Sequence, residues 1–421
     1  MNLREFTKVG HWPTLLCSFL YFDISFAIWM LFGALANAIV ADLPLASWEK
    51  GLLVGTPILS GAILRLVLGV MGDRIGTRRT ALLGMALTSL PLVLGWLWAE
   101  SFGEILLVGL LLGVAGGSFA VALPLASRWY KPEHQGLALG IAAAGNSGTC
   151  LATLLGPWLA GQFGWHAVFG LALLPLGLVL VPFALFAKDS PDQPPPKSLA
   201  DYLAVVRLRD TWALALFYAI TFGGFVGLAS FLSLFFHDQY GSSPVQAGGF
   251  VALCVLAGSF LRPLGGYLAD RIGGISLLTI VFGAASILLL DLATSPPMLW
   301  GMVLLVTLMA LFGIGNGAVF QLVPQRFPKE IGAATGVIGA TGCVGGFFLP
   351  TLFGGVHQLT GGYGPGFLLL AFMAGGGIVL LFRLSKAWDG IFITKGGLAT
   401  TASQPAPSSN REPDMAGARL T

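Results

Sequence analysis

The fold is decided by the stretch Gly51–Met71, GLLVGTPILSGAILRLVLGVM, which is long enough to cross a bilayer and carries an arginine in its interior. A second such stretch, Gln246–Ala269 (QAGGFVALCVLAGSFLRPLGGYLA), holds Arg262 as the first holds Arg65. A guanidinium keeps its proton in a protein, and placing one at the bilayer centre costs roughly 3 kcal/mol on insertion scales. Each arginine therefore implies a polar or anionic partner inside the membrane.

The composition indicates a polytopic membrane protein. Of 421 residues, 56% are hydrophobic and only 10% charged, whereas soluble domains are about 25% charged. The net charge of +3 is small and spread over loops, which gives no nucleic-acid signature. We find no phosphate loop, metal motif or nucleophile–base arrangement, so we expect neither an enzyme nor a cofactor. The cysteines form no CxxC or Cys/His cluster and are expected to be small core residues: Cys17, Cys150, Cys254 and Cys343.

Runs of about twenty apolar residues predict an all-α protein with twelve transmembrane helices. The first follows a polar start and is long enough to span, so we do not expect a cleaved signal peptide. A polar, proline-containing segment at 188–210 predicts a linker between an N-terminal bundle (1–187) and a C-terminal bundle (211–385). Residues 386–421 form a predicted tail, disordered from about Ala399. The predicted helices are 12–39, 51–71, 79–98, 103–127, 136–161, 166–187, 211–236, 246–269, 275–294, 298–323, 332–356 and 363–384.

The distribution of Lys and Arg predicts the orientation. With twelve helices, nineteen of the 22 basic residues fall on the side of the N-terminus and one, Lys50, on the other. The remaining two are the intramembrane arginines. By the positive-inside rule, both termini are expected in the cytoplasm.

The two halves of the sequence repeat. Gly61–Gly76 matches Gly258–Gly273 without gaps at an offset of 197, which makes Arg65 and Arg262 equivalent residues of the second helix in each half. Parallel six-helix repeats place the substrate site at the axis between them. We therefore expect the two arginines to face each other across that axis. A second match, at an offset of 200, pairs Gly113, Gly117 and Pro124 with Gly313, Gly317 and Pro324.

Two like charges in one cavity predict an anion. Asp23 is the one acidic residue embedded in the membrane interior, since the others fall in loops or near helix ends, and one acid cannot balance both arginines. Guanidinium groups suit a planar or tetrahedral oxyanion because they donate in pairs. The alternative is that each arginine snorkels to the membrane surface or binds backbone carbonyls and so packs helices. This alternative is less favoured for two arginines related by the repeat than for a single arginine. An anion that bridges the pair would screen their repulsion and let the halves close, as alternating access requires.

Glycine-rich and aromatic positions are candidates for the rest of the site. The stretches that contain Gly145-Asn146 and Gly342 correspond across the repeat and could present backbone amides to a small anion. Helix packing by small residues is the alternative, and Asn146 is the stronger functional candidate. The aromatic candidates, each of which could equally be core, are Phe26, Phe119, Tyr218 and Phe222.

Asp23 has two interpretations. It is either a protonatable group that couples proton entry to anion entry, or a permanent partner of Arg65 or of helix polar groups.

Charged residues in two repeated loops also have two interpretations. They are either solvated or form an ion-paired latch that stabilises an outward-facing state. The glycines and the repetition favour the latch. The residues concerned are Asp73, Arg74, Arg78, Asp270 and Arg271.

The loop Gly69–Arg79 (GVMGDRIGTRR) resembles the signature between helices two and three of the major facilitator superfamily. Its second copy, Gly266–Gly273, lacks the basic pair. To about residue 385 the chain resembles NarK-type nitrate/nitrite porters, most strongly in GVAGGSFAVALP … GIAAAGNSGTCLATLLGP and GIGNGAVFQLVPQRFP … GAATGVIGATGCVGGFFLP.

This resemblance implies that Arg65 and Arg262 hold nitrate or nitrite. It implies aromatic contacts from Phe119, Tyr218 and Phe222, with Phe26 or Phe22 from the first helix. Asn146 and the helix-eleven glycines match the family's nitrate signatures.

One departure concerns coupling. Ala142-Ala143-Ala144 precedes Gly145-Asn146, where some relatives are rich in glycine and asparagine. The family includes proton symporters and nitrate/nitrite exchangers, and Asp23 favours symport. We therefore expect a monomeric nitrate and/or nitrite porter that serves nitrate assimilation. The alternatives are a porter for another small anion, such as a monocarboxylate, and a non-transporting anion receptor.

Overall fold

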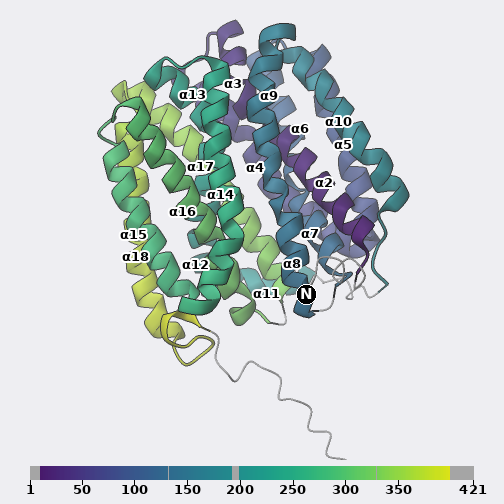
Figure 1. The fold of residues 1–421 in the computed structure, drawn as a ribbon, viewed down its shortest axis with the longest axis vertical. Coiled ribbons are helices and arrows are strands. Elements are labelled where there is room, and N and C mark those ends of the chain that lie inside the picture. The colour runs from purple at the N-terminus through teal and green to yellow at the C-terminus, as the bar shows by residue number, and fades with distance from the viewer. Residues whose placement is uncertain (1–9, 131, 192–198, 329, 399–421) are drawn as a thin grey trace, which may run out of the picture.

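The computed structural model describes residues 10–130, 132–191, 199–328 and 330–398, which are almost entirely helical. Twelve helical segments in these ranges are long and apolar enough to cross a membrane. They stand side by side in one bundle (Figure 1). The twelve predicted spans and the all-α fold class are confirmed, whereas the predicted disordered tail from Ala399 lies outside the described residues.

The first six crossings are built from ten helical segments. They are α2 (Trp12–Trp29) with α3 (Leu31–Asp42), α4 (Ser47–Ile75), α5 (Thr77–Leu97), α6 (Phe102–Gly116) with α7 (Phe119–Ser127), α8 (Pro132–Ala143) with η1 (Ala144–Ser147) and α9 (Gly148–Phe163), and α10 (Trp165–Phe186).

The last six crossings repeat this order after a short linker helix, α11 (Leu199–Val206). They are α12 (Arg209–Tyr218) with η2 (Ala219–Gly223) and α13 (Gly224–Tyr240), α14 (Pro244–Ile272), α15 (Gly274–Leu292), α16 (Met298–Arg326), α17 (Ile331–Thr360) and α18 (Gly364–Trp388).

Helices α4 and α14 are longer than their apolar runs because polar caps extend them. Ser243 accepts a hydrogen bond from the Gln246 backbone, and the Gln246 side chain accepts one from Ser243 in return. At the start of α4 the Glu49 carboxylate accepts from the Ala46 backbone N–H at 2.7 Å. Both helices reach 29 residues, five or more beyond the predicted stretches 51–71 and 246–269.

Four crossings are not continuous helices, although their apolar pattern predicts continuity. The first breaks at Met30, the fourth at Gly117–Ser118, and the fifth contains the 3₁₀ turn η1. In the seventh, η2 is a π-helical turn. Such irregular turns change the direction in which side chains project and are common at functional sites.

The halves meet along α4 against α17 and α9 against α14. At Gly51 a Cβ would lie 2.3 Å from the Pro350 carbonyl oxygen, and at Gly248 it would lie 2.1 Å from that of Thr153. Neither position tolerates a side chain, so glycine sets the distance between the two halves.

Polar contacts between the halves gather at one end of the bundle, which we call the Lys50 end. Lys50 Nζ lies 3.3 Å from Asp238 Oδ2 of the other half, and the Tyr363 hydroxyl, in the same half as Asp238, donates to that oxygen at 2.8 Å. Burial raises the pKa of Tyr363, and the Asp238 carboxylate raises this pKa further, so the hydroxyl keeps its proton and remains a donor. Ser47 Oγ also lies 3.0 Å from His357 Nδ1. These contacts hold the Lys50 end closed.

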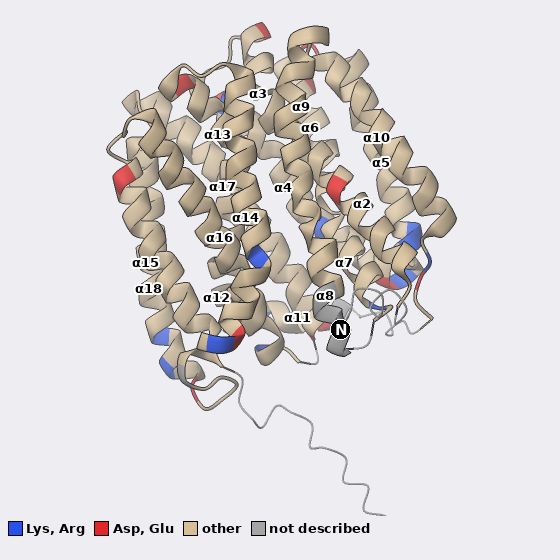
Figure 2. Cartoon of the chain, in the orientation of Figure 1, with Lys and Arg blue, Asp and Glu red and all other residues tan. Residues whose placement is uncertain are grey.

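The other end, which we call the linker end, carries α11 and the start of the C-terminal tail (Figure 1). Figure 2 shows charged residues at both ends and few between them. The sequence did not predict α11, whose Tyr202 ring lies 3.8 Å from the point where a Cβ on Gly336 of α17 would stand. The linker therefore packs against the C-terminal half.

The predicted latch residues lie at the linker end and make their contacts within one half. Arg128 donates to Asp73 at 2.8 Å, and Arg78 donates to the Ala184 carbonyl at 2.6 Å. Arg271 lies over the Tyr267 ring at 4.4 Å. Among the described residues, Arg74 and Asp270 enter no ion pair. The conformational state that these loops favour remains a prediction.

Closure at the Lys50 end can be tested with Lys50→Ala and Asp238→Ala. A partly exposed ion pair contributes about 1 kcal/mol or less, so each change should raise the open fraction up to about fivefold. The measurement is the rate at which an impermeant maleimide labels a cysteine placed at Ser230, whose hydroxyl bonds to the Val54 carbonyl of the other half. The background has its four native cysteines replaced by alanine.

The matched control is the charge swap Lys50→Asp with Asp238→Lys, which should restore slow labelling. Equal labelling rates in all four proteins would show that the ion pair does not contribute to closure.

Candidate functional site

The two intramembrane arginines meet at one aromatic ring. The centroid of Phe119 lies 4.8 Å from Arg65 Cζ and 5.7 Å from Arg262 Cζ. The two guanidinium carbons can therefore be no further apart than these two distances combined. Phe119 is the first residue of α7, directly after the break at Gly117–Ser118, so this break sets the place of the shared ring.

Arg65 is deeply buried, and its hydrogen-bond partners among the described residues carry no negative charge. The residue is 1% exposed, and its Nη2 donates to the Gly116 carbonyl at 3.3 Å. Nη1 donates at 3.2 Å to the carbonyl of Gly339, which belongs to α17 in the other half. Nε has no partner. The carbonyl-bound arrangement considered from the sequence is therefore present, yet it leaves the charge uncompensated.

Arg262 is partly buried and less tightly held. Nη2 lies 3.5 Å from the Tyr218 hydroxyl, a long hydrogen bond, while Nη1 is buried without a partner. Its Cζ also lies 5.6 Å from the centroid of Phe320. The ring faces attract both cations, but the described residues place no carboxylate in an ion pair with either.

Aromatic side chains from four crossings form the wall around the arginines. Tyr218 and Phe222 stack at 4.8 Å with an interplanar angle of 1°, and Phe222 lies 5.4 Å from Arg65 Cζ. The π-helical turn η2 follows Tyr218 and contains Phe222. Phe320 meets the Tyr218 ring edge-on at 4.9 Å. The sequence named Tyr218, Phe119 and Phe222 but missed Phe320.

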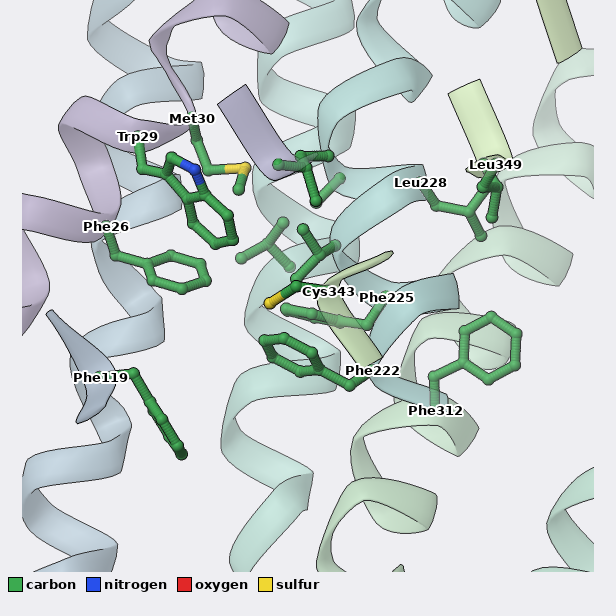
Figure 3. Packing of buried hydrophobic residues seen from close by; sticks show 14 of the residues in the cluster. Phe26, Trp29, Met30, Phe119, Phe222, Phe225, Leu228, Phe312, Cys343 and Leu349 are labelled. Carbon is green, nitrogen blue, oxygen red and sulfur yellow. The ribbon is translucent and has the colours of Figure 1, made fainter. Parts of the chain in front are cut away.

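The first helix supplies two rings to this wall. Phe22 lies 5.6 Å from Phe119, and Phe26 packs on Phe22 at 5.3 Å and on Trp29 at 5.1 Å. Figure 3 shows Phe26, Phe119 and Phe222 around a common space. Of the two first-helix candidates, Phe22 makes the ring contact with Phe119, whereas Phe26 packs on Phe22 and Trp29.

The candidate glycines act through close packing. At Gly145 a Cβ would lie 2.7 Å from the Phe22 ring, and at Gly342 it would lie 2.3 Å from the Tyr218 ring. Both glycines therefore let a helix press against an aromatic wall. This is the packing role considered as the alternative, and it positions the rings that line the site.

Buried polar atoms without a partner recur in the helices around the arginines. Such atoms are few in native proteins and call for an explanation. Asn146 is 2% exposed in η1, and its Oδ1 is among them. Asn316 of α16, one helical turn before Phe320, has the same feature and was not predicted. In addition to Arg65 Nε and Arg262 Nη1, these atoms include Ser118 Oγ, Thr149 Oγ1 and Ser259 Oγ.

Asp23 is directed to the start of α9 rather than to Arg65. Its carboxylate accepts from Ser147 Oγ at 2.9 Å and from the Gly148 backbone N–H. At Gly148 a Cβ would lie 1.8 Å from the Asp23 carbonyl oxygen, so α2 and α9 are in contact there. An acid at a helix N-terminus is favoured by the unpaired N–H groups. Of the two permanent partners considered from the sequence, the structure therefore shows helix polar groups rather than Arg65.

Comparison with known proteins gives the relationship of the chain. The family model described as Major Facilitator Superfamily matches residues 16–350. The nitrite extrusion protein of Bacillus subtilis is 33% identical over 85% of this chain and 90% of its own length. The probable nitrate/nitrite transporter NarK2 of Mycobacterium tuberculosis is 36% identical over 82% of this chain and 90% of its own.

Solved structures show the same fold at lower identity. A bacterial homologue of the human lysosomal transporter Spinster, in an inward-facing and occupied conformation, aligns with a TM-score of 0.67 at 20% identity. It covers 88% of this chain and 96% of its own. The human organic anion transporter MFSD10 aligns with a TM-score of 0.66 at 16% identity, over 88% and 99% of the two chains. The chain belongs to the major facilitator superfamily, in the branch that holds the NarK-type proteins.

Proposed function

We propose that this protein is a secondary transporter of nitrate and/or nitrite that binds its anion between Arg65 and Arg262. The observation that carries the proposal is the pair of guanidinium groups at one Phe119 ring, each without a carboxylate partner among the described residues. The relatives whose names mention nitrate or nitrite support the choice of anion.

The shape and polarity of the site favour a small planar oxyanion. Guanidinium groups offer paired N–H donors to two oxygens of one anion, and such charge-assisted bonds strengthen where water is excluded. The walls are flat rings, and the unpartnered atoms Arg65 Nε and Arg262 Nη1 are donors. A monocarboxylate brings an additional alkyl group, which makes it a weaker candidate for this position.

The contacts between the halves support alternating access as the mechanism. Arg65 of α4 reaches the Gly339 carbonyl of α17, so the anion-binding residue is itself a link between the halves. An anion held by both arginines removes their repulsion and favours closure around the site. Residues 1–187 and 211–385 would then rock about the anion, joined by the linker 188–210.

The orientation in the membrane rests on the distribution of Lys and Arg. The linker end, with both termini, would face the cytoplasm, and the Lys50 end would face outward in an inner membrane. With the Lys50 end closed, the structure corresponds to a state that does not admit anions from outside. We propose that the porter serves the assimilation of nitrate. We also propose that it operates as a monomer.

The arginine pair can be tested by nitrate and nitrite flux into proteoliposomes, with internal nitrite or an imposed pH gradient. Arg65→Lys and Arg262→Lys keep the charge but lose the paired donors. A hydrogen bond to a charged group contributes about 1.5–3 kcal/mol, so each variant should lose roughly ten- to a hundredfold in flux.

The matched control is Arg207→Lys, a change at an exposed linker residue, which should leave flux unchanged. Absence of nitrate and nitrite flux in the wild type would refute the anion assignment, and binding without flux would indicate a receptor. Unimpaired flux in both lysine variants would refute the role of the arginines.

Asp23 is the candidate for proton coupling, since it is a partly buried acid beside the 3₁₀ turn that contains Asn146. We expect Asp23→Asn to abolish uptake driven by a pH gradient and to leave nitrate/nitrite exchange intact. The matched variant is Ser147→Ala, which removes the hydrogen bond but keeps the carboxylate and should retain pH-driven uptake. Unchanged pH dependence in Asp23→Asn would exclude proton coupling by Asp23 and leave it a structural role in its contact with α9.

A further inference from the structure

Cys343 occupies the middle of α17 between two contacts of the candidate site. Four residues before it, the Gly339 carbonyl accepts from Arg65, and directly before it Gly342 packs on the Tyr218 ring. The Cys343 thiol interacts with the Arg65 guanidinium and lies in the electrostatic surroundings of Tyr218. Figure 3 shows its sulfur directed into the space between Phe26, Phe119 and Phe222.

The other three cysteines are placed differently. Cys17 Sγ lies 3.8 Å from the Pro182 carbonyl oxygen, and Cys150 Sγ lies 3.6 Å from that of Ala252. Cys254 is fully buried in the hydrophobic core. For these three, the prediction of small core residues agrees with their surroundings. Cys343 is also buried and unpaired, but its charged neighbour is the Arg65 guanidinium of the candidate site, whereas that of Cys150 is the Asp23 carboxylate.

Arg65, the neighbour of Cys343, has a hydrogen-bond donor that is free to bind a ligand. Arg65 is 1% exposed, and its Nε has no partner, whereas Nη1 and Nη2 donate to carbonyl oxygens. A thiol is a weak donor and a weak acceptor, so Cys343 cannot neutralise this charge. The sulfur therefore borders the position where an anion would meet Arg65.

Resting on the proposed function, we infer that Cys343 forms part of the wall of the anion site and limits the size of the anion that Arg65 accepts. The thiol is smaller than the rings that form the other walls. A larger side chain at position 343 would push an anion away from Arg65, and nitrate, with one more oxygen than nitrite, would be affected first. A smaller side chain would remove this limit.

The inference can be tested by protection of the thiol. Full-length protein with Cys17, Cys150 and Cys254 changed to alanine is reconstituted in liposomes and treated with N-ethylmaleimide, with and without nitrate. We expect saturating nitrate to slow labelling of Cys343 at least tenfold, as read by mass spectrometry. A matched protein that keeps only Cys254 should show no nitrate effect.

A second pair of variants separates direct contact from a change of conformation. Cys343→Val should raise the nitrate KM at least fivefold more than the nitrite KM, whereas Cys254→Val should leave the ratio of the two unchanged. Labelling of Cys343 that is independent of nitrate, absence of labelling in every condition, or an unchanged KM ratio in Cys343→Val would each overturn the inference.

These outcomes are distinct from failure of the proposed function. Arginine-dependent nitrate flux with no protection of Cys343 would leave the transporter proposal intact and show only that Cys343 is not part of the anion site. Protection by acetate or formate but not by nitrate would keep Cys343 in the site and replace the proposed anion.

Discussion

Two arginine side chains that keep their positive charge lie against one aromatic ring inside a bundle of membrane-crossing helices. Phe119 lies within 5.7 Å of both guanidinium carbons, and the oxygens that Arg65 and Arg262 reach are neutral. Carbonyls and ring faces stabilise a guanidinium in part, but they do not cancel its charge. The protein therefore presents a buried excess of positive charge, and an anion is the partner that this charge favours.

Irregular helix turns place the groups around this charge. The break before Phe119, the 3₁₀ turn that holds Asn146 and the π-helical turn beside Tyr218 and Phe222 all lie at the site. Close glycine contacts bring the two halves near enough for Arg65 to reach the Gly339 carbonyl. Local backbone geometry, packing and charge thus act together at the interface where a rocking motion would take place.

The sequence predicted the twelve crossings and the equivalence of the arginines because both depend on regular patterns. Apolar runs have the length of a bilayer, and the repeat has a constant offset. It did not predict the helix breaks, since the apolar pattern continues through Met30 and through Ala219–Gly223. Phe320 and Asn316 were missed because the side chains that face the arginines depend on the rotation of α16 about its axis, which the apolar pattern does not give. For Asp23 the sequence left Arg65 and helix polar groups open as partners, and the structure shows the latter, since a nearby helix N-terminus competes with a distant arginine for the carboxylate.

The central claim is that one anion is shared by both arginines, and the number of anions bound tests it most directly. Equilibrium binding of labelled nitrate to the purified full-length protein should give one site per chain. That site should be lost in Arg65→Lys and equally in Arg262→Lys, because each variant removes one side of the same contact. Two nitrate ions per chain, with each variant losing only one, would contradict the claim and show two independent arginine sites.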